Sequence, residues 1–261
     1  MRSRSSPPAP IRTILNFSVP APCCCCGKPV TRSSLPPSRW GTAESREINP
    51  ARLREIRRGE AQAAAARLRA GYRTLGFDDF AIFAGDEANR RATALLRETN
   101  PAVVFAHPPA DYISDHEAAS RVIRNACFYA SAPNYAAPTA APATAAIPHL
   151  YYFAPLGGTD IFGAPLVQTT YVDVSDQIEE KTALLACHAS QRAWLRAQHG
   201  MDEYLEAMRR ACRDFGREAS ELAGRKIPYA EAFCQHLGHP YPANDRLTLL
   251  LGTDRVIRRA R

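Results

Sequence analysis

The chain has 261 residues, of which 46% are hydrophobic, enough for one large domain or two small ones with a sizeable core. Its formal net charge is +7, but residues 1–40 hold six Lys or Arg and no Asp or Glu. The remaining chain is therefore nearly neutral, which argues against nucleic-acid binding. No apolar run has the length of a membrane span, and residues 1–40 lack the apolar core of a secretory signal. We therefore expect a cytoplasmic protein, although an Arg- and Ser-rich, acid-free start also resembles an organelle transit peptide.

Residues 1–40 are unlike the rest of the chain in composition as well as in charge. They contain eight prolines and show no amphipathic period, which predicts disorder. The run Cys23-Cys24-Cys25-Cys26 lacks the two-residue separation that lets zinc thiolates converge, and no second pair follows it. We interpret residues 1–40 as an aberrant segment and residues 41–261 as the folded domain. The other four cysteines are predicted to be buried thiols and are Cys127, Cys187, Cys212 and Cys234.

From residue 49 onward the apolar pattern alternates between helices and strands. Asn49 and Pro50 are typical of a helix start, and the amphipathic pattern that follows ends at Gly71. A weak strand is predicted over residues 74–77, a helix over residues 87–98 and a short buried strand over Val103–Ala106. This alternation predicts an α/β fold with a parallel sheet and right-handed crossovers.

The segment that follows this strand carries the most informative polar residues. Ser114 and Glu117 have the spacing of a capping box, which predicts Ser114 as the N-cap of the next helix. Asp115 and His116 then fall in the first helical turn, at the carboxyl end of a buried strand. A histidine held there suits a metal ligand or a proton-transfer group, whereas a histidine that merely satisfies a helix end is the plainer alternative.

The second half begins with a Pro/Ala-rich connector over residues 132–148, which could form a lid. Strands are predicted at residues 150–153 and 171–174, and Ser175 is predicted to cap a helix with Leu184, His188, Gln191 and Leu195 on one face. His188 is therefore either a core histidine or a polar group directed at the site. A further helix is expected over residues 202–222, and a weak alternation follows it. His236 and His239 flank a turn without a nearby carboxylate, so a metal site there is not favoured, and the Arg-rich end is predicted to be solvated.

Several of these motifs, in this order, resemble those of one enzyme family. They are His107-Pro108 with Asp111-Tyr112, the Asp115-His116-Glu117 helix start, the Arg57-Arg58-x-Glu60-Ala61 helix, Tyr151-Tyr152 and the Cys187–Gln191 block. The set resembles the PIG-L/LmbE-like family of zinc-dependent de-N-acetylases over about residues 41–252. The resemblance implies a Rossmann-like three-layer α/β sandwich with a mostly parallel sheet. It also implies a Zn²⁺ cofactor and a small-molecule N-acetylated substrate, with no nucleic acid and no membrane span, and it leaves homo-oligomerisation open.

The resemblance also assigns site residues, one by one. His116 matches the family's metal ligand, and Asp115 is the adjacent carboxylate that would orient it. Ile113 stands where many relatives have a second histidine, so His188 is our candidate for the residue that stabilises the oxyanion. The family's first block, an Ala-His-Pro-Asp-Asp sequence that supplies two further ligands and the catalytic base, is absent here.

A change of reading frame is our interpretation of this missing block. One allowed set of codons for Pro10–Phe17, read from one base earlier, encodes His-Pro-Asp-Asp-Ile-Glu-Phe. In the same frame the cysteine run becomes leucines, because TGT or TGC is then read as TTG or CTG. The hidden sequence is a catalytic loop followed by an apolar helix. We therefore expect the first β-α unit to be missing, with the sheet uncovered at that position.

The function indicated is a zinc-dependent hydrolase that removes an acetyl group from an N-acetyl amino sugar or a related small amide. With His116 as its only assigned ligand, this chain is expected to be impaired, because one ligand cannot hold zinc tightly. The alternative is a non-catalytic remnant of the fold that acts at most as a binding module. Zinc content separates the two hypotheses.

Overall fold

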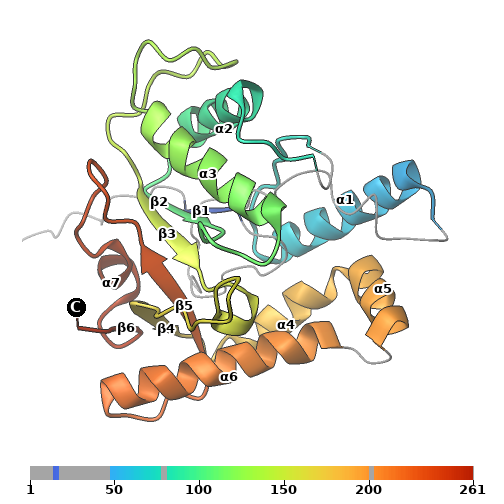
Figure 1. Ribbon diagram of the computed structural model, residues 1–261, viewed down its shortest axis with the longest axis vertical. Helices are drawn as coiled ribbons and strands as arrows, with labels where there is room; N and C mark the ends of the chain where they lie inside the picture. The colour runs from blue at the N-terminus through green and yellow to red at the C-terminus, as the bar shows by residue number, and fades with distance from the viewer. Residues whose placement is uncertain (1–13, 18–47, 78–80, 200–202, 261) are drawn as a thin grey trace, which may run out of the picture.

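The computed structural model describes residues 14–17, 48–77, 81–199 and 203–260, and all structural statements below refer to them. They form one sheet with helices on both of its faces (Figure 1). In chain order the elements are β1 (Ile14–Phe17), α1 (Pro50–Arg67), α2 (Asp86–Thr99), β2 (Val103–Ala106), α3 (Ser114–Tyr129), β3 (His149–Phe153), the 3-10 turn η1 (Leu156–Gly158), β4 (Thr170–Asp173), α4 (Ile178–Ala186), α5 (Ala189–His199), α6 (Glu203–Ala223), β5 (Ala230–Gln235), α7 (Arg246–Leu251) and β6 (Val256–Arg258).

The sheet is mixed rather than mostly parallel. Its strand order is β1-β2-β3-β5-β4-β6. β2 pairs in parallel with β1 and β3, whereas the β3–β5, β4–β5 and β4–β6 pairs are antiparallel. The α/β architecture is confirmed, but the prediction of a mostly parallel sheet is wrong in this detail. The predicted alternation of helix and strand holds from α2 to β3. Of the later strands, β4 runs in the direction of β3, whereas β5 and β6 run in the opposite direction.

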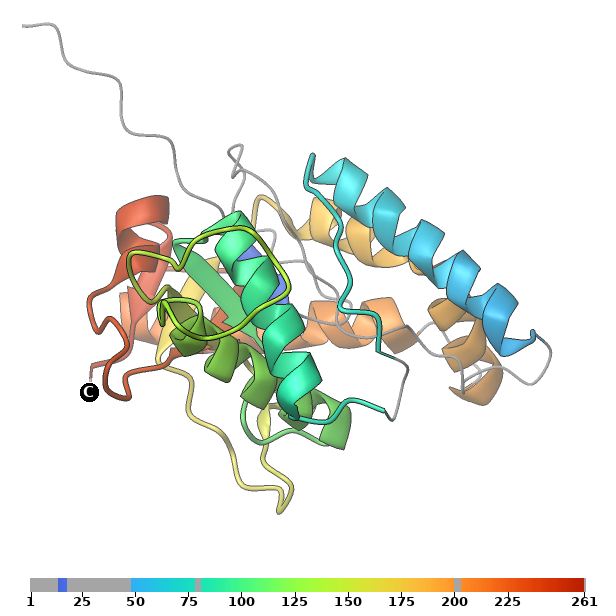
Figure 2. The same ribbon diagram turned by 90° about the horizontal axis from the view of Figure 1, so that it is seen from above.

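β2 lies inside the sheet and places its side chains alternately on the two faces. Val104 and Ala106 pack with residues of α2 and α3, whereas Val103 and Phe105 pack with Leu247 of α7. Figure 2 shows α2 and α3 side by side, on the opposite side of the sheet from α7. All four residues of β2 are fully buried. The predicted buried strand and the three layers are therefore confirmed, and the carboxyl end of β2 is held rigidly between its neighbours.

The sheet position beside β2 is occupied, against our expectation that the first strand is missing. β1 pairs with β2 in parallel along its length, from Ile14 opposite Val103 to Phe17 opposite Ala106. Strand formation needs only an extended apolar segment of a few residues, and Ile14–Phe17 supplies one. Apart from Ile14–Phe17, which form β1, the segment predicted to be disordered lies outside the described residues, as does the helix of the expected missing unit.

The first long helix begins as the sequence predicts, because the Asn49 side chain accepts a hydrogen bond from the Arg52 amide at 2.9 Å. It ends at Arg67, before the predicted Gly71. The helix predicted over residues 87–98 is present as α2, the Pro/Ala-rich connector is irregular, and the helix predicted over residues 202–222 is present as α6. The weak strand expected at residues 74–77 does not form.

Three predictions in the second half are wrong. The helix expected to carry His188 on one of its faces is divided into α4 and α5, and His188 lies in the turn between them. Ser175 does not cap it, because its hydroxyl donates to Asp173 Oδ1 at 2.7 Å. The basic C-terminal residues also differ from the predicted solvated end. Arg258 ends strand β6, and Arg259 pairs with Glu218 of α6.

α6 approaches the backbone before β5 so closely that only glycine fits at one position. A Cβ atom on Gly216 would lie 2.7 Å from the Ile227 carbonyl oxygen and 2.8 Å from that of Pro228. Among the described helices, none combines the length and the apolar character that a bilayer crossing requires.

Candidate metal centre

The loop between β2 and α3 brings three potential metal ligands together. His107 directly follows β2, Asp111 lies in the middle of the loop, and His116 lies in the first turn of α3. Their ligand atoms all lie within 4.8 Å of one another. The carboxyl end of a buried parallel strand is where open α/β sheets place their ligands.

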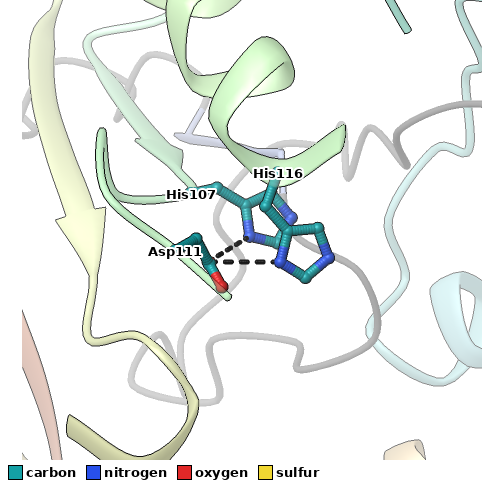
Figure 3. Close-up of side chains that lie close together, drawn as sticks. All are labelled: His107, Asp111 and His116. Carbon is teal, nitrogen blue, oxygen red and sulfur yellow. Dashed lines mark ion pairs between the residues drawn. The ribbon is translucent and has the colours of Figure 1, made fainter. Parts of the chain in front are cut away.

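Asp111 is the centre of this group (Figure 3). Its Oδ2 atom lies 3.1 Å from His116 Nδ1 and 3.8 Å from His107 Nδ1. The two imidazole rings stack with centroids 3.8 Å apart and an interplanar angle of 17°. Both Nδ1 atoms therefore face the same carboxylate oxygen, and the three donors are directed at one region.

Burial sets the charge state of the group. Burial lowers the pKa of His107 to about 4, so this imidazole is neutral at pH 7. Burial alone would raise the pKa of Asp111, but its contacts with His107 and His116 outweigh this and lower the value to about 2. The group therefore consists of an ionised carboxylate and a neutral histidine beside His116, and neutral imidazole and carboxylate are the forms that ligate metals.

A divalent ion fits these residues on two grounds. First, two histidines and one carboxylate are the donor set of catalytic zinc sites that keep an open position. Second, His116 Nδ1 is buried and has no hydrogen-bond partner, although it lies 3.1 Å from Asp111 Oδ2. An orphaned buried nitrogen beside a carboxylate costs free energy unless another ligand satisfies it. The site opens on the His116 side, where 17% of that side chain is exposed and Tyr112 stands edge-on at 5.4 Å.

Of the three site residues predicted from the sequence, only His116 lies in the three-donor group. His116 lies in the first turn of the helix after β2, as predicted, and it also belongs to the three-donor group. The carboxylate beside it is that of Asp111, whereas the sequence assigned this orienting role to Asp115. His188 is not in the group. It is buried between α4 and α5 near Arg57 of α1, and burial, with a smaller contribution from Arg57, lowers its pKa to about 4.

Glu60 of α1 holds the turn that contains His188. Its two carboxylate oxygens accept hydrogen bonds from the amide and the hydroxyl of Ser190, each at 2.7 Å. Arg67 of α1 forms a further pair with Glu180 of α4 at 2.9 Å. Helix α1 therefore packs against the turn that contains His188, and the Glu60 carboxylate satisfies the Ser190 amide near the start of α5.

Sequence reasoning missed His107 and Asp111 as potential ligands. Both were noted as parts of a motif, but only His116 was assigned to the metal. The signal was available, because three potential ligands occur within ten residues directly after a buried strand. The predicted capping box is also wrong. Ser114 is the first helical residue after the N-cap Ile113, and Glu117 accepts the Asp111 amide instead of a cap amide.

The family described as PIG-L: GlcNAc-PI de-N-acetylase matches residues 31–127, a range that contains all three ligand candidates. Among curated protein sequences, none matches the chain.

Solved structures with a similar fold include enzymes of different activities. GalB, the 4-carboxy-2-hydroxymuconate hydratase from Pseudomonas putida KT2440, is 20% identical with a TM-score of 0.68, covering 89% of this chain and 98% of that chain. N,N'-diacetylchitobiose deacetylase from Pyrococcus horikoshii is 19% identical with a TM-score of 0.65, covering 90% and 88%. The zinc inhibited form of teicoplanin deacetylase Orf2 is 14% identical with a TM-score of 0.57, covering 87% and 99%. At these identities the likeness shows the fold alone.

The mixed sheet with helices on both faces defines an α/β protein, and it carries a histidine–carboxylate group at the end of an inner strand. The family match over residues 31–127 agrees with the resemblance that the motifs indicated.

Proposed function

We propose that this protein is a zinc-dependent hydrolase that removes the acetyl group from an N-acetyl amino sugar. The observation that carries the proposal is the His107–Asp111–His116 group, inside the range that matches a de-N-acetylase family. Chitobiose and teicoplanin deacetylases with the same fold support this substrate class. GalB shows that the fold also hosts a hydratase, so the fold by itself does not decide the reaction.

His107, Asp111 and His116 would hold the ion, and His116, the most exposed of the three, would lie beside the substrate. Bound zinc supplies Lewis acidity, which polarises an amide carbonyl and acidifies a water molecule. Asp111 contributes the negative charge of the group, and the burial of His107 and Asp111 excludes bulk water from one side. His188 remains our candidate for stabilising the oxyanion, with Asp115 near the helix start as a supporting carboxylate.

The expected impairment of the chain rested on a count of one ligand. Three donors now stand together, so weak zinc binding is no longer the reason to expect it. The residue that accepts the proton of the attacking water is the part of the mechanism still unassigned. A chain that binds zinc but releases no acetate would fit the alternative of a non-catalytic binding module.

Metal content and acetate release test the proposal together. The purified protein is loaded with Zn²⁺, dialysed, and assayed for bound zinc and for acetate released from N,N'-diacetylchitobiose. We expect stoichiometric zinc in the native chain and its loss in His116→Ala. His149→Ala is the matched control. His149 is the first residue of β3, at the end of the strand away from the candidate ligands, and it contacts Asn244. Equal zinc content in His116→Ala and the native chain would refute the metal centre.

A further inference from the structure

Glu117 occupies an unexpected place in the loop that carries the candidate ligands. It lies in the first turn of α3, next to His116 in sequence. Its Oε1 atom accepts a hydrogen bond from the Asp111 amide at 3.1 Å, across six residues of chain. The contact therefore closes the irregular segment between Asp111 and the helix into a ring.

This hydrogen bond acts on the backbone of the central ligand. One oxygen of Asp111, Oδ1, accepts the Tyr112 amide at 2.7 Å, which leaves Oδ2 for the two imidazoles. The Asp111 carboxylate is thus oriented by its own loop, and Glu117 fixes the amide at the base of that side chain. Without Glu117 the partly buried Asp111 amide would lose its hydrogen-bond partner, and the loop would be free to move.

The same contact joins two ligands mechanically. His116 is positioned by helix α3, and its amide donates to the Ile113 carbonyl at 3.1 Å. Asp111 lies before the helix, in a segment that no strand or helix holds. Since Glu117 belongs to the helix, its hydrogen bond to Asp111 transfers the rigidity of the helix to the loop ligand.

We infer that Glu117 is a positioning residue for the metal centre: it holds Asp111 in register with His116, so that segment 107–117 is a self-contained binding loop for a divalent ion. The inference rests on the proposed metal centre. It implies that removing Glu117 weakens metal binding although Glu117 contributes no ligand atom. Partners of this kind typically change metal affinity by about 10–100-fold.

The test measures zinc affinity by chelator competition, and the visible absorption of bound Co²⁺, in full-length variants. We expect Glu117→Ala to lower the zinc affinity by about 10–100-fold and to alter the Co²⁺ spectrum at saturation, because Asp111 no longer meets the ion in register. Glu117→Gln keeps an oxygen that accepts the amide and should retain most of the affinity. Glu87→Ala is the matched control, because it removes a first-turn carboxylate from α2, where Glu87 pairs with Arg91.

The outcomes separate this inference from the metal centre itself. If Asp111→Ala and His116→Ala lose zinc while Glu117→Ala binds it like the native chain, the positioning role is wrong and the metal centre stands. If none of these variants loses zinc, the metal centre fails. Should Glu117→Ala not fold, Glu117→Asp decides, since its shorter side chain keeps the charge but not the reach. Native affinity and an unchanged Co²⁺ spectrum in Glu117→Asp would overturn the inference.

Discussion

Acid should destabilise this protein through His188, because the fold buries that side chain in its neutral form. His188 is only 6% exposed, and burial lowers its pKa from 6.5 to about 4. Between these two values the unfolded chain binds a proton at His188 that the folded protein excludes. The free energy of unfolding therefore falls as the pH falls, whereas above the unfolded pKa His188 contributes nothing.

The size of the effect follows from these two pKa values. Proton linkage for a single group gives a loss of about 1.4 kcal/mol at about pH 5.5 and about 2.6 kcal/mol at about pH 4.5, relative to neutral pH. His107 and Asp111 also have lowered pKa values and add to the acid sensitivity of the whole protein. Their contributions cancel when two chains that differ only at residue 188 are compared.

The assay is urea unfolding of the metal-free native chain and of His188→Gln, from neutral pH to about pH 4.5. The stability difference between the two chains should move by about 2.6 kcal/mol in favour of the variant over this range. A difference that does not change with pH would show that His188 titrates alike in the folded and unfolded states. It would also remove the support for a neutral imidazole that donates a hydrogen bond to an oxyanion.

Three further predictions concern packing and the missing block. Gly216→Ala should lower the free energy of unfolding by about 1–2 kcal/mol, because the added Cβ would overlap backbone atoms. Gly59→Ala, which has open space around it, should raise the free energy of unfolding by about 0.5–1 kcal/mol. Urea unfolding measures both changes. Phe105→Ala should cost about 3–5 kcal/mol in the same assay, since its ring is fully buried against three other aromatic rings; a smaller loss would mean that the site collapses. Restoring the alternative frame between about residues 6 and 40 should supply the Ala-His-Pro-Asp-Asp loop and raise acetate release, and in that chain His188→Ala should retain zinc and lower turnover by about 10²-fold. Equal turnover in the native and repaired chains would contradict the frame interpretation, which resequencing of these codons tests directly.

The sequence by itself was sufficient for several local features of the fold. Asn49 and Pro50 predicted the start of α1, because a side-chain oxygen and a fixed φ angle act within one helical turn. The apolar run at β2 predicted a buried strand, and the motif after it placed His116 in the first turn of α3. These features depend on neighbours a few residues away, and a sequence pattern records such neighbours directly.

Only the tertiary structure decided the features that depend on distant segments. The direction of β5, opposite to both of its neighbours β3 and β4, is set by which strands pair, and no local pattern in these short strands records it. The break between α4 and α5 is stabilised by Glu60, which lies 130 residues before Ser190 in the sequence.

The metal centre was predicted from the sequence only in part. The sequence placed His116 correctly, but the capping-box spacing predicted a local partner for Glu117, whereas the folded loop gives it the Asp111 amide. The path of an irregular loop decides whether donors converge, and spacing along the chain does not determine that path. The spacing could have suggested His107 and Asp111 as candidates, but their convergence with His116 is decided by how the loop folds back on the helix that carries His116.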